Sequence, residues 1–226
     1  HPVAHSFPTR RSSDLVEKPK EKSILEQFEL SSSMKEKIGI TDSKQKYLAS
    51  MGIYLFSRSF LKDSMEMPGN DFGKNVIPQA IKKYKVYAFP FLNYWRDVGL
   101  IENFYQTNMD LFTPTRKEIV TPCLNTNTRY RHLSSPCILG NVTKSIISNG
   151  CIVEEKSCIS KSVLGYQVQV DKDTVIDNSI LLGASRHFRR DGKMIRSVYT
   201  EVGANSHLKR VILDKNVWIG DNVKIG

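Results

Sequence analysis

Residues 147–182 read ISNGCIVEEKSCISKSVLGYQVQVDKDTVIDNSILL, and their apolar side chains recur at a regular interval. Apart from one interruption, the interval is six residues within a series and five where one series changes to the next. The positions in register are Ile147, Val153, Ile159, Leu164, Val170, Ile176, Leu182, Val202, Leu208, Leu213, Ile219 and Ile225. Neither an α-helix, with a period of about 3.6, nor an ordinary strand, with a period of about 2, gives this spacing. A period of six is typical of a parallel β-helix, in which three hexapeptide sides form one coil of a prism.

The residues between the apolar positions suit the corners of such a prism. Small residues that let the chain turn follow the apolar ones at Gly165, Gly203, Gly220 and Gly226. Asparagine, which tolerates left-handed dihedral angles, occurs near the corners at Asn149, Asn178, Asn205, Asn216 and Asn222. Residues 184–198 interrupt the period and are expected to form a loop between coils. The sequence therefore predicts a β-helix over 137–226, and because the pattern is still running at Gly226 we expect the chain to be a piece of a longer protein.

A different pattern occupies residues 16–112, where segments suited to strands alternate with segments suited to helices. Residues 47–56 and 85–91 are rich in apolar, aromatic and β-forming residues, which is typical of buried strands. Asp71 can cap a helix whose apolar face carries Val76, Ile77, Ala80 and Ile81, and residues 101–111 fit a short amphipathic helix. This alternation predicts an open α/β sheet. Residues 113–136, which contain several Pro, Ser and Asn residues, read as a linker to the β-helix.

The first fifteen residues differ from both regions. Residues 5–15, HSFPTRRSSDL, can be back-translated into a string that resembles a sequencing-library adapter. They also lack the apolar run of a signal peptide. We therefore expect residues 1–15 to be an artefact, and the genuine sequence to begin at Val16.

The overall composition favours some classes of protein and excludes others. The 226 residues are 40% hydrophobic and 25% charged, as in a globular protein, and they contain no apolar run long enough to span a membrane. Lysine and arginine number 33 against 23 acidic residues, which gives a net charge of +10. Because the basic residues are scattered, they favour a solvated basic surface or phosphorylated small-molecule ligands over nucleic acid. The four cysteines, Cys123, Cys137, Cys151 and Cys158, form no CxxC pair, which argues against a zinc cluster and indicates small core or linker residues.

Two short motifs in the first half of residues 16–112 could contact a sugar phosphate, and each also has a purely structural interpretation. Glu17-Lys18-Pro19 projects a carboxylate and an ammonium from a rigid backbone, but taken alone it is better explained as a surface tripeptide. The stretch ASMGIY at 49–54 places the hydroxyl of Ser50 and the phenol of Tyr54 around a glycine, but it could equally be a core strand.

Two further motifs lie downstream of these. In NDFG, residues 70–73, Asp71 could contact a ligand or could simply cap a helix. In YWRDVG, residues 94–99, aromatic rings beside Asp97 suit a sugar, whose apolar face stacks while its hydroxyls bond to the carboxylate. The structural interpretation is that Trp95 plugs the sheet edge while Arg96 and Asp97 cap a helix.

The order of these motifs, followed by hexapeptide repeats, resembles the glucose-1-phosphate adenylyltransferase family, or ADP-glucose pyrophosphorylases. The resemblance covers residues 16–226, and it extends to SSP at 134–136 and ILDKN at 212–216. It implies part of a Rossmann-like α/β nucleotidyltransferase domain followed by a left-handed parallel β-helix of hexapeptide repeats.

The resemblance also implies a glucose 1-phosphate site made by Glu17, Lys18, Ser50, Tyr54, Asp71, Phe72, Trp95 and Asp97. Lys18 would pair with the phosphate, while Glu17 and Asp97 would accept hydrogen bonds from glucose hydroxyls. Ser50 would bond to the phosphate or a hydroxyl, and the aromatic rings would shape the pocket. Lys215 matches a position linked to a phosphorylated allosteric effector in some members, although an exposed lysine at a β-helix corner explains it equally well.

The implied reaction converts ATP and glucose 1-phosphate into ADP-glucose and diphosphate with Mg²⁺, in glycogen or starch synthesis. The family further implies a homotetramer in the cytoplasm, or in the plastid of a plant. Its glycine-rich nucleotide loop, catalytic arginine and lysine, and Mg²⁺-binding aspartate lie upstream of the EKP motif, and no such loop occurs here. We therefore expect no catalytic residue and no metal ligand within this chain, and no turnover by this chain alone.

Three alternatives use the same features differently. A uridylyl- or thymidylyltransferase also carries an EKP-like motif, although YWRDVG and the interrupted β-helix disfavour it. A hexapeptide acyltransferase would need a general-base histidine, for which His187 and His207 are the candidates. A non-catalytic subunit would keep the β-helix for assembly and regulation without turnover.

Overall fold

The computed structural model describes residues 4–6, 14–16, 19–42, 44–114, 119, 133–184 and 199–226. The chain divides into two compact units, His1–Trp95 and Arg96–Gly226. Glu17, Lys18, Cys123 and His187 lie outside the described residues, as does nearly all of the interruption predicted at 184–198. The two units are described separately below.

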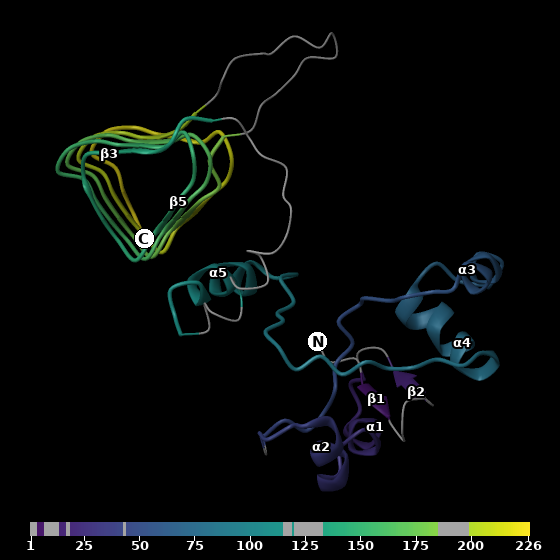
Figure 1. Cartoon of the computed structure of the whole chain (residues 1–226). Coiled ribbons are helices and arrows are strands. Elements are labelled where there is room, and N and C mark those ends of the chain that lie inside the picture. Colours follow the sequence, from purple (N-terminus) through teal and green to yellow (C-terminus); the bar gives the residue numbers. More distant parts are fainter. Residues whose placement is uncertain are drawn as a thin grey trace. The chain divides into compact units, whose positions relative to one another are not determined.

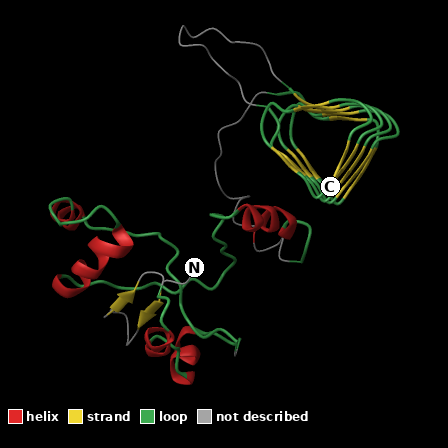
Figure 2. Cartoon of the chain, turned by 180° about the vertical axis from the view of Figure 1, so that it is seen from behind, coloured by secondary structure: helices red, strands yellow, loops and turns green. Residues whose placement is uncertain are grey.

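Three parallel sheets form the sides of a triangular prism in the second unit (Figures 1 and 2). The first sheet consists of β4 (Asn141–Thr143), β7 (Cys158–Ser160), β10 (Val175–Asp177), β13 (His207–Lys209) and β16 (Lys224–Ile225). The second consists of β5 (Ile146–Ile147), β8 (Val163–Leu164), β11 (Ile180–Leu181) and β14 (Ile212–Leu213). The third consists of β3 (Cys137–Ile138), β6 (Ile152–Val153), β9 (Val168–Val170), β12 (Thr200–Val202) and β15 (Trp218–Ile219). The predicted β-helix over 137–226 is confirmed.

The register of the strands shows how long one coil is. Val142 pairs with Ile159, which pairs with Ile176, so equivalent residues are seventeen positions apart. Ile176 then pairs with Leu208, thirty-two positions on, so fifteen extra residues enter between these two coils. This number matches the length of the interruption predicted at 184–198. Two sides of a coil therefore take six residues and the third takes five, which explains the mixed interval in the sequence.

The core of the prism is a column of apolar side chains, with one difference from the prediction. Val153, Ile159, Leu164 and Ile176 are fully buried, as the period indicates. The second sheet places Leu181, not Leu182, in the core: Leu181 is 0% exposed and pairs with Leu164. The assignment of Leu182 was wrong because the five-residue side shifts the inward position back by one.

The corners contain stacked hydroxyl groups that the apolar period does not reveal. Ser157, Thr174 and Ser206 occupy the same corner of successive coils and are fully buried. The backbone N–H of Thr174 donates to the Ser157 hydroxyl (3.5 Å), and that of Ser206 donates to the Thr174 hydroxyl (3.3 Å). Each hydroxyl in turn donates to a backbone carbonyl, over 2.7–3.0 Å. A second ladder of this kind runs through Ser145, Ser162 and Ser179. These bonds satisfy backbone groups that turn away from the sheets at the corners.

Glycine and asparagine serve the corners in two different ways. Asn178, Asn205, Asn216 and Asn222 have positive φ angles between 46° and 61°, as expected, whereas at the first corner the positive φ falls on Gly150 instead of Asn149. Gly165 is needed for close approach, because a Cβ there would lie 2.3 Å from the carbonyl oxygen of Leu182. At the corners, asparagine therefore supplies left-handed dihedral angles, whereas Gly165 is required because there is no room for a side chain.

One of the cysteines belongs to the β-helix core. Cys151 is buried, its thiol donates to the carbonyl of Gly165 (3.0 Å), and burial raises the pKa of the thiol. Cys137 and Cys158 are exposed on their strands, so the expectation of small core residues holds for Cys151 alone among these three.

A helix precedes the β-helix within the second unit. α5 (Ile101–Asp110) confirms the amphipathic helix predicted over 101–111. The hydroxyl of Tyr105 donates to the backbone carbonyl of Asn178 over 2.7 Å, so the helix is attached to a corner of the prism. α5 therefore belongs to the compact unit that contains the β-helix.

The first unit contains five short helical elements and one pair of strands among the residues described. The elements are α1 (Lys22–Gln27), α2 (Ser32–Ile38), α3 (Arg58–Ser64), the π-helical turn η1 (Phe72–Val76), α4 (Ile77–Lys83), and the antiparallel strands β1 (Ala4–Ser6) and β2 (Asp14–Val16). The predicted helix face is confirmed, since Val76, Ile77, Ala80 and Ile81 are all buried.

The prediction of two strands in this unit is wrong for the described residues. Residues 47–56 and 85–91 contain no strand. Their inward side chains, Tyr54, Phe56 and Val86, pack against Ile77 and Ile81 of α4, as strands of an α/β unit would. Hydrogen bonds to neighbouring strands are what define a strand, and neither segment pairs with one in the described part of the chain. Alternate apolar side chains consequently face solvent: Leu55 is 101% exposed and Phe89 is 87% exposed.

Candidate functional site

A cavity of about 360 Å³ in the first unit brings two of the predicted motifs together. Its lining residues come from ASMGIY and from NDFG: Ser50, Gly52, Tyr54, Asn70, Asp71, Phe72 and Gly73. Four of these, Ser50, Tyr54, Asp71 and Phe72, are predicted sugar-phosphate residues. The structure therefore unites side chains about twenty positions apart in the sequence.

One wall of the cavity is built by the start of η1. The Asp71 carboxylate accepts a hydrogen bond from the backbone N–H of Lys74 (2.9 Å), which confirms the predicted helix cap. The side-chain oxygen of Asn75 accepts from the N–H of Asp71 (3.3 Å), so the cap is held from both sides. The capping bond engages Oδ1 of the carboxylate. The structural interpretation of Asp71 as a helix cap is therefore confirmed, and its contact with a ligand stays a prediction.

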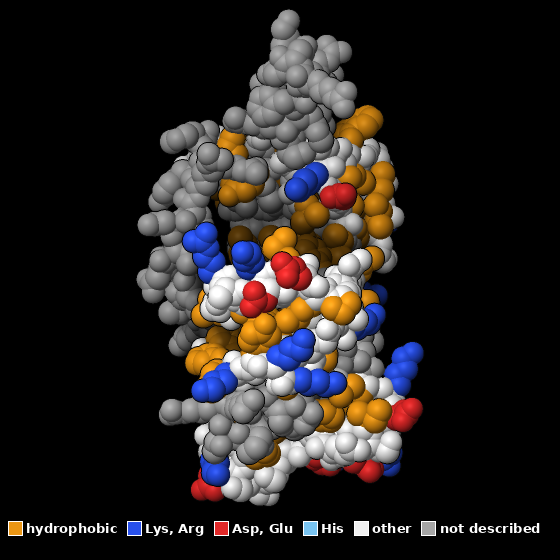
Figure 3. All heavy atoms as spheres, turned by 90° about the vertical axis from the view of Figure 1, so that its right-hand side faces the viewer, with side chains coloured by type: hydrophobic (Ala, Val, Ile, Leu, Met, Phe, Trp, Pro, Cys, Tyr) orange, Lys and Arg blue, Asp and Glu red, His pale blue; other side chains and the backbone are white. Residues whose placement is uncertain are grey.

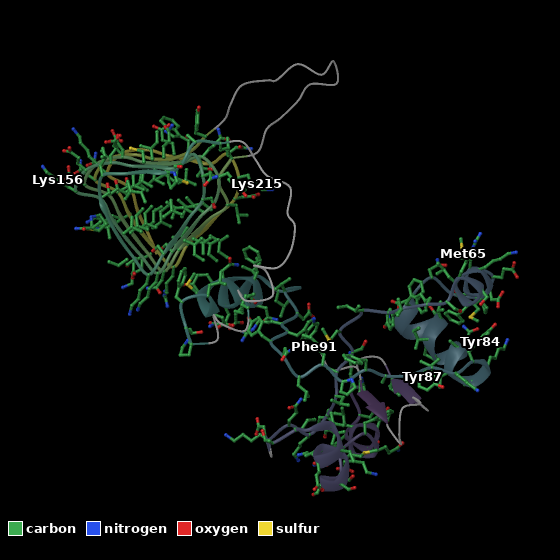
Figure 4. All side chains as sticks on the ribbon, viewed as in Figure 1. Met65, Tyr84, Tyr87, Phe91, Lys156 and Lys215 are labelled. Carbon is green, nitrogen blue, oxygen red and sulfur yellow. The ribbon has the colours of Figure 1, made fainter. Side chains whose placement is uncertain are left out.

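Aromatic rings form the apolar side of the cavity. Tyr54 and Phe72 lie 6.2 Å apart between ring centroids, and Phe56 stacks on Phe72 at 5.6 Å. Phe60 extends the cluster and meets Tyr84 edge-on at 5.0 Å. Figure 4 shows Tyr84 close to α4. Stacked rings whose faces reach solvent can receive the apolar face of a pyranose ring.

Ser50 and Gly52 form the opposite wall through a tight turn. The N–H of Gly52 donates to the Ser50 hydroxyl oxygen (3.1 Å), and Gly52 has a φ of +70°. Because the Ser50 oxygen acts as an acceptor here, its own hydrogen is directed elsewhere and can be donated to a phosphate or hydroxyl oxygen. The sequence does not single out Gly52, Asn70 and Gly73 as lining residues, although their places beside Ser50 and Asp71 would have suggested them.

Trp95 and Asp97 do not line this cavity. Trp95 is 42% exposed at the end of the first unit. Asp97 begins a turn in the second unit, where its Oδ1 accepts a hydrogen bond from the N–H of Gly99 (3.0 Å). The structural alternative for this motif is wrong in one respect, because α5 starts after Leu100 without a side-chain cap. Arg96 instead pairs with Asp110 at the other end of α5 (3.2 Å).

Lys215 lies exposed in the β-helix, next to a corner. Its backbone N–H donates a hydrogen bond to Oδ1 of Asp214 (2.7 Å), and the corner residue Asn216 has a φ of +61°. Figure 4 places Lys215 and Lys156 at different corners of the prism. Both interpretations of Lys215, effector contact and simple surface lysine, fit this position.

The described residues offer no cluster of three or more His, Cys, Asp or Glu side chains for a metal ion. Of the two histidines considered for an acyltransferase, His207 is exposed on β13. No helix in the described ranges is long and apolar enough to cross a membrane. On the face drawn in Figure 3, the Lys and Arg side chains are scattered among apolar and acidic ones.

Comparisons with known proteins match both units. A family described as nucleotidyl transferase matches residues 3–113, and a family described as the GLGC left-handed parallel β-helix domain matches residues 131–226. Among curated proteins, the chain is 36% identical over 206 residues to the chloroplastic/amyloplastic small subunit of glucose-1-phosphate adenylyltransferase from Triticum aestivum. The match covers 83% of this chain and 42% of the wheat protein, so the chain spans less than half of its relative's length. These matches confirm the predicted succession of a nucleotidyltransferase region and a left-handed β-helix.

Proposed function

Because this chain belongs to the glucose-1-phosphate adenylyltransferase family, we propose that the protein it comes from makes ADP-glucose from ATP and glucose 1-phosphate. In this reaction a phosphate oxygen of glucose 1-phosphate attacks the α-phosphorus of ATP and forms a new P–O bond. The bond from the α-phosphorus to the oxygen that bridges it to the β-phosphorus breaks, and diphosphate leaves with that oxygen. The product serves glycogen or starch synthesis.

The observation that carries this proposal is the cavity that joins Ser50, Tyr54, Asp71 and Phe72. Its aromatic side suits the apolar face of glucose, while the hydroxyl groups and the carboxylate suit the sugar hydroxyls and the phosphate. We assign the chain the sugar-phosphate side of the active site. Its residues bind and orient the attacking phosphate, and such positioning acts together with electrostatic stabilisation in the catalysis of phosphoryl transfer.

The remaining predicted residues complete the same proposal. Lys18 pairs with the phosphate, and Glu17 and Asp97 accept hydrogen bonds from glucose hydroxyls. Trp95 contributes an aromatic face. Lys215 contacts a phosphorylated effector of the full-length protein.

Mg²⁺ belongs to the proposal for the full-length enzyme, where it would neutralise charge on the phosphates. The described residues do not fit a metal site, because they contain no cluster of carboxylates. We therefore assign the ion no ligand among the described residues. We also propose that the chain alone does not form ADP-glucose, that the full-length enzyme is a homotetramer, and that in a plant it resides in the plastid, as the name of the wheat relative indicates for that protein.

The proposal is tested in the full-length protein by replacing cavity side chains. Ser50→Ala and Tyr54→Phe are each expected to raise KM for glucose 1-phosphate by about tenfold, the loss expected for a hydrogen bond to a charged group, and to leave KM for ATP within about twofold of the parent. Ser33→Ala, which removes the same hydroxyl from an exposed position in α2, is the matched control and is expected to change neither constant.

Two results would contradict the proposal. An unchanged KM for glucose 1-phosphate in both cavity variants would remove the cavity from the sugar site. A preference of the parent protein for UTP or dTTP over ATP would instead assign it to another sugar nucleotidyltransferase.

A further inference from the structure

The second unit contains an ion pair between Arg96, whose side chain is 36% exposed, and the buried carboxylate of Asp110. Nη2 of Arg96 lies 3.2 Å from Oδ2 of Asp110, and Asp110 is only 8% exposed. The side-chain amide of Gln106 donates to the other oxygen, Oδ1, over 3.0 Å. Both oxygens of the carboxylate therefore have partners, and the group is fixed in one orientation. Charge-assisted bonds of this kind are stronger and more directional than those between neutral groups.

Arg96 lies next to two residues that we propose to contact glucose. Arg96 stands between Trp95 and Asp97, the two residues of this motif assigned to glucose. Asp97 is itself held by the turn in which its Oδ1 accepts from the N–H of Gly99 (3.0 Å). The anchored side chain of Arg96 restricts the backbone of the residues on both sides of it.

The helix that carries Asp110, α5, is itself attached to the β-helix. The hydroxyl of Tyr105 donates to the carbonyl of Asn178 (2.7 Å), a corner residue with a φ of +46°. At the end of α5, the backbone carbonyl of Asp110 accepts hydrogen bonds from the hydroxyl (2.7 Å) and the N–H (3.1 Å) of Thr113, which fixes the last turn. Asp110 is thus presented from an element bonded to a rigid prism.

We infer that Asp110 is a positioning residue for the sugar-binding turn at 95–99, which it holds through Arg96. The inference rests on the proposed function, because it assumes that Asp97 contacts glucose. Asp110 does not touch the substrate. It fixes the orientation of Arg96, so that Asp97 is presented in one geometry before glucose 1-phosphate arrives. Preorganisation of this kind increases affinity because less freedom is lost on binding.

The test is Asp110→Asn in the full-length protein, which keeps the shape of the side chain and removes its charge. KM for glucose 1-phosphate is expected to rise by between about ten- and one-hundred-fold, the range that a misplacement of about 1 Å can produce, while KM for ATP stays within about twofold. Glu102→Gln, which neutralises an exposed carboxylate on the same helix, is the matched control and is expected to leave both constants unchanged.

A second pair of variants separates positioning from general stability. Arg96→Gln is expected to have the same effect as Asp110→Asn, and the double variant is expected to be no worse than either, because both changes break one interaction. If Asp110→Asn fails to fold, Arg96→Lys keeps the charge without the planar fork of arginine and is expected to raise the same KM. Equal rises in both KM values together with loss of circular dichroism, or additive effects in the double variant, would overturn the inference.

Asp97→Asn distinguishes failure of the inference from failure of the proposed function. A large rise in KM for glucose 1-phosphate in Asp97→Asn, with no change in Asp110→Asn, would refute the positioning role alone. No change in either variant would remove the whole turn from the sugar site and with it this part of the proposed function.

Discussion

Replacement of Thr174 by valine tests whether the buried hydroxyl ladders hold the coils of the β-helix together. The Thr174 side chain is 0% exposed, donates to the carbonyl of Gly203 (2.8 Å) and accepts from the N–H of Ser206 (3.3 Å). Valine has nearly the same shape but can make neither bond. Each buried polar group that loses its partner costs about 1–3 kcal/mol. Because two groups are affected, we expect Thr174→Val to lower the free energy of unfolding by roughly 2–6 kcal/mol.

Urea unfolding of the intact chain, followed by far-ultraviolet circular dichroism, measures this change in the transition of the β-helix. Thr174→Ser keeps the hydroxyl and loses one methyl group, so it is expected to cost only about 1 kcal/mol. Thr143→Val makes the same substitution at an exposed position of β4 and is expected to stay within about 0.5 kcal/mol of the parent. The reasoning is refuted if Thr174→Val costs no more than Thr174→Ser, because the hydroxyl would then contribute nothing beyond its packing.

Three further predictions follow from contacts in the two units. Gly165→Ala is expected to destabilise the β-helix by about 1–3 kcal/mol, since its new Cβ would meet a backbone carbonyl oxygen at 2.3 Å, whereas Gly220→Ala, where a Cβ meets no atom within 4 Å, should be nearly neutral in the same urea experiment. Asp71→Ala should cost about 1 kcal/mol through loss of the cap, whereas Asp71→Asn should retain stability and still weaken glucose 1-phosphate binding, which calorimetry and activity assays separate. The hydrogen bond from Ser160 lowers the pKa of Asp177; a lowered pKa stabilises the fold above the ordinary value of about 3.9, and this contribution is lost as the pH falls through the folded-state pKa. Asp177→Asn should therefore reduce the acid sensitivity of thermal unfolding, and an unchanged pH profile would contradict it.

The β-helix could be predicted nearly residue by residue because its period repeats. Each coil uses the same inward positions, so a dozen observations support one geometry. The exception, Leu181 in place of Leu182, arose where two leucines stand together at a five-residue side. Spacing alone does not decide between neighbours of the same type. The buried Thr174 and its equivalents were missed for a related reason, since serine and threonine near corners are also typical of solvent-exposed turns.

Within the first unit, the local features were predictable and the sheet was not. The cap at Asp71 and the buried face of α4 depend on residues within a few positions of each other. A strand, in contrast, depends on a neighbour elsewhere in the sequence that supplies its hydrogen bonds. The side chains of residues 47–56 show the inward and outward alternation of a strand, yet the backbone is not paired. The alternation of apolar residues indicates which side chains point inward. It does not indicate which other segment will supply the backbone hydrogen bonds of a strand.

The same distinction explains why the cavity that we propose for the sugar forms without the sheet. Its walls come from the turn at Ser50 and from the cap at Asp71, and each is stabilised by hydrogen bonds spanning only two or three residues. The aromatic contacts between Tyr54 and Phe72 then bring the two walls together. The lining of a candidate site assembled from local motifs can therefore be predicted from the sequence before its supporting sheet can. The turn that carries Asp97 is also stabilised locally. It is closed by the hydrogen bond from the N–H of Gly99 to Asp97, two residues apart, and the neighbouring Arg96 pairs with Asp110 of α5.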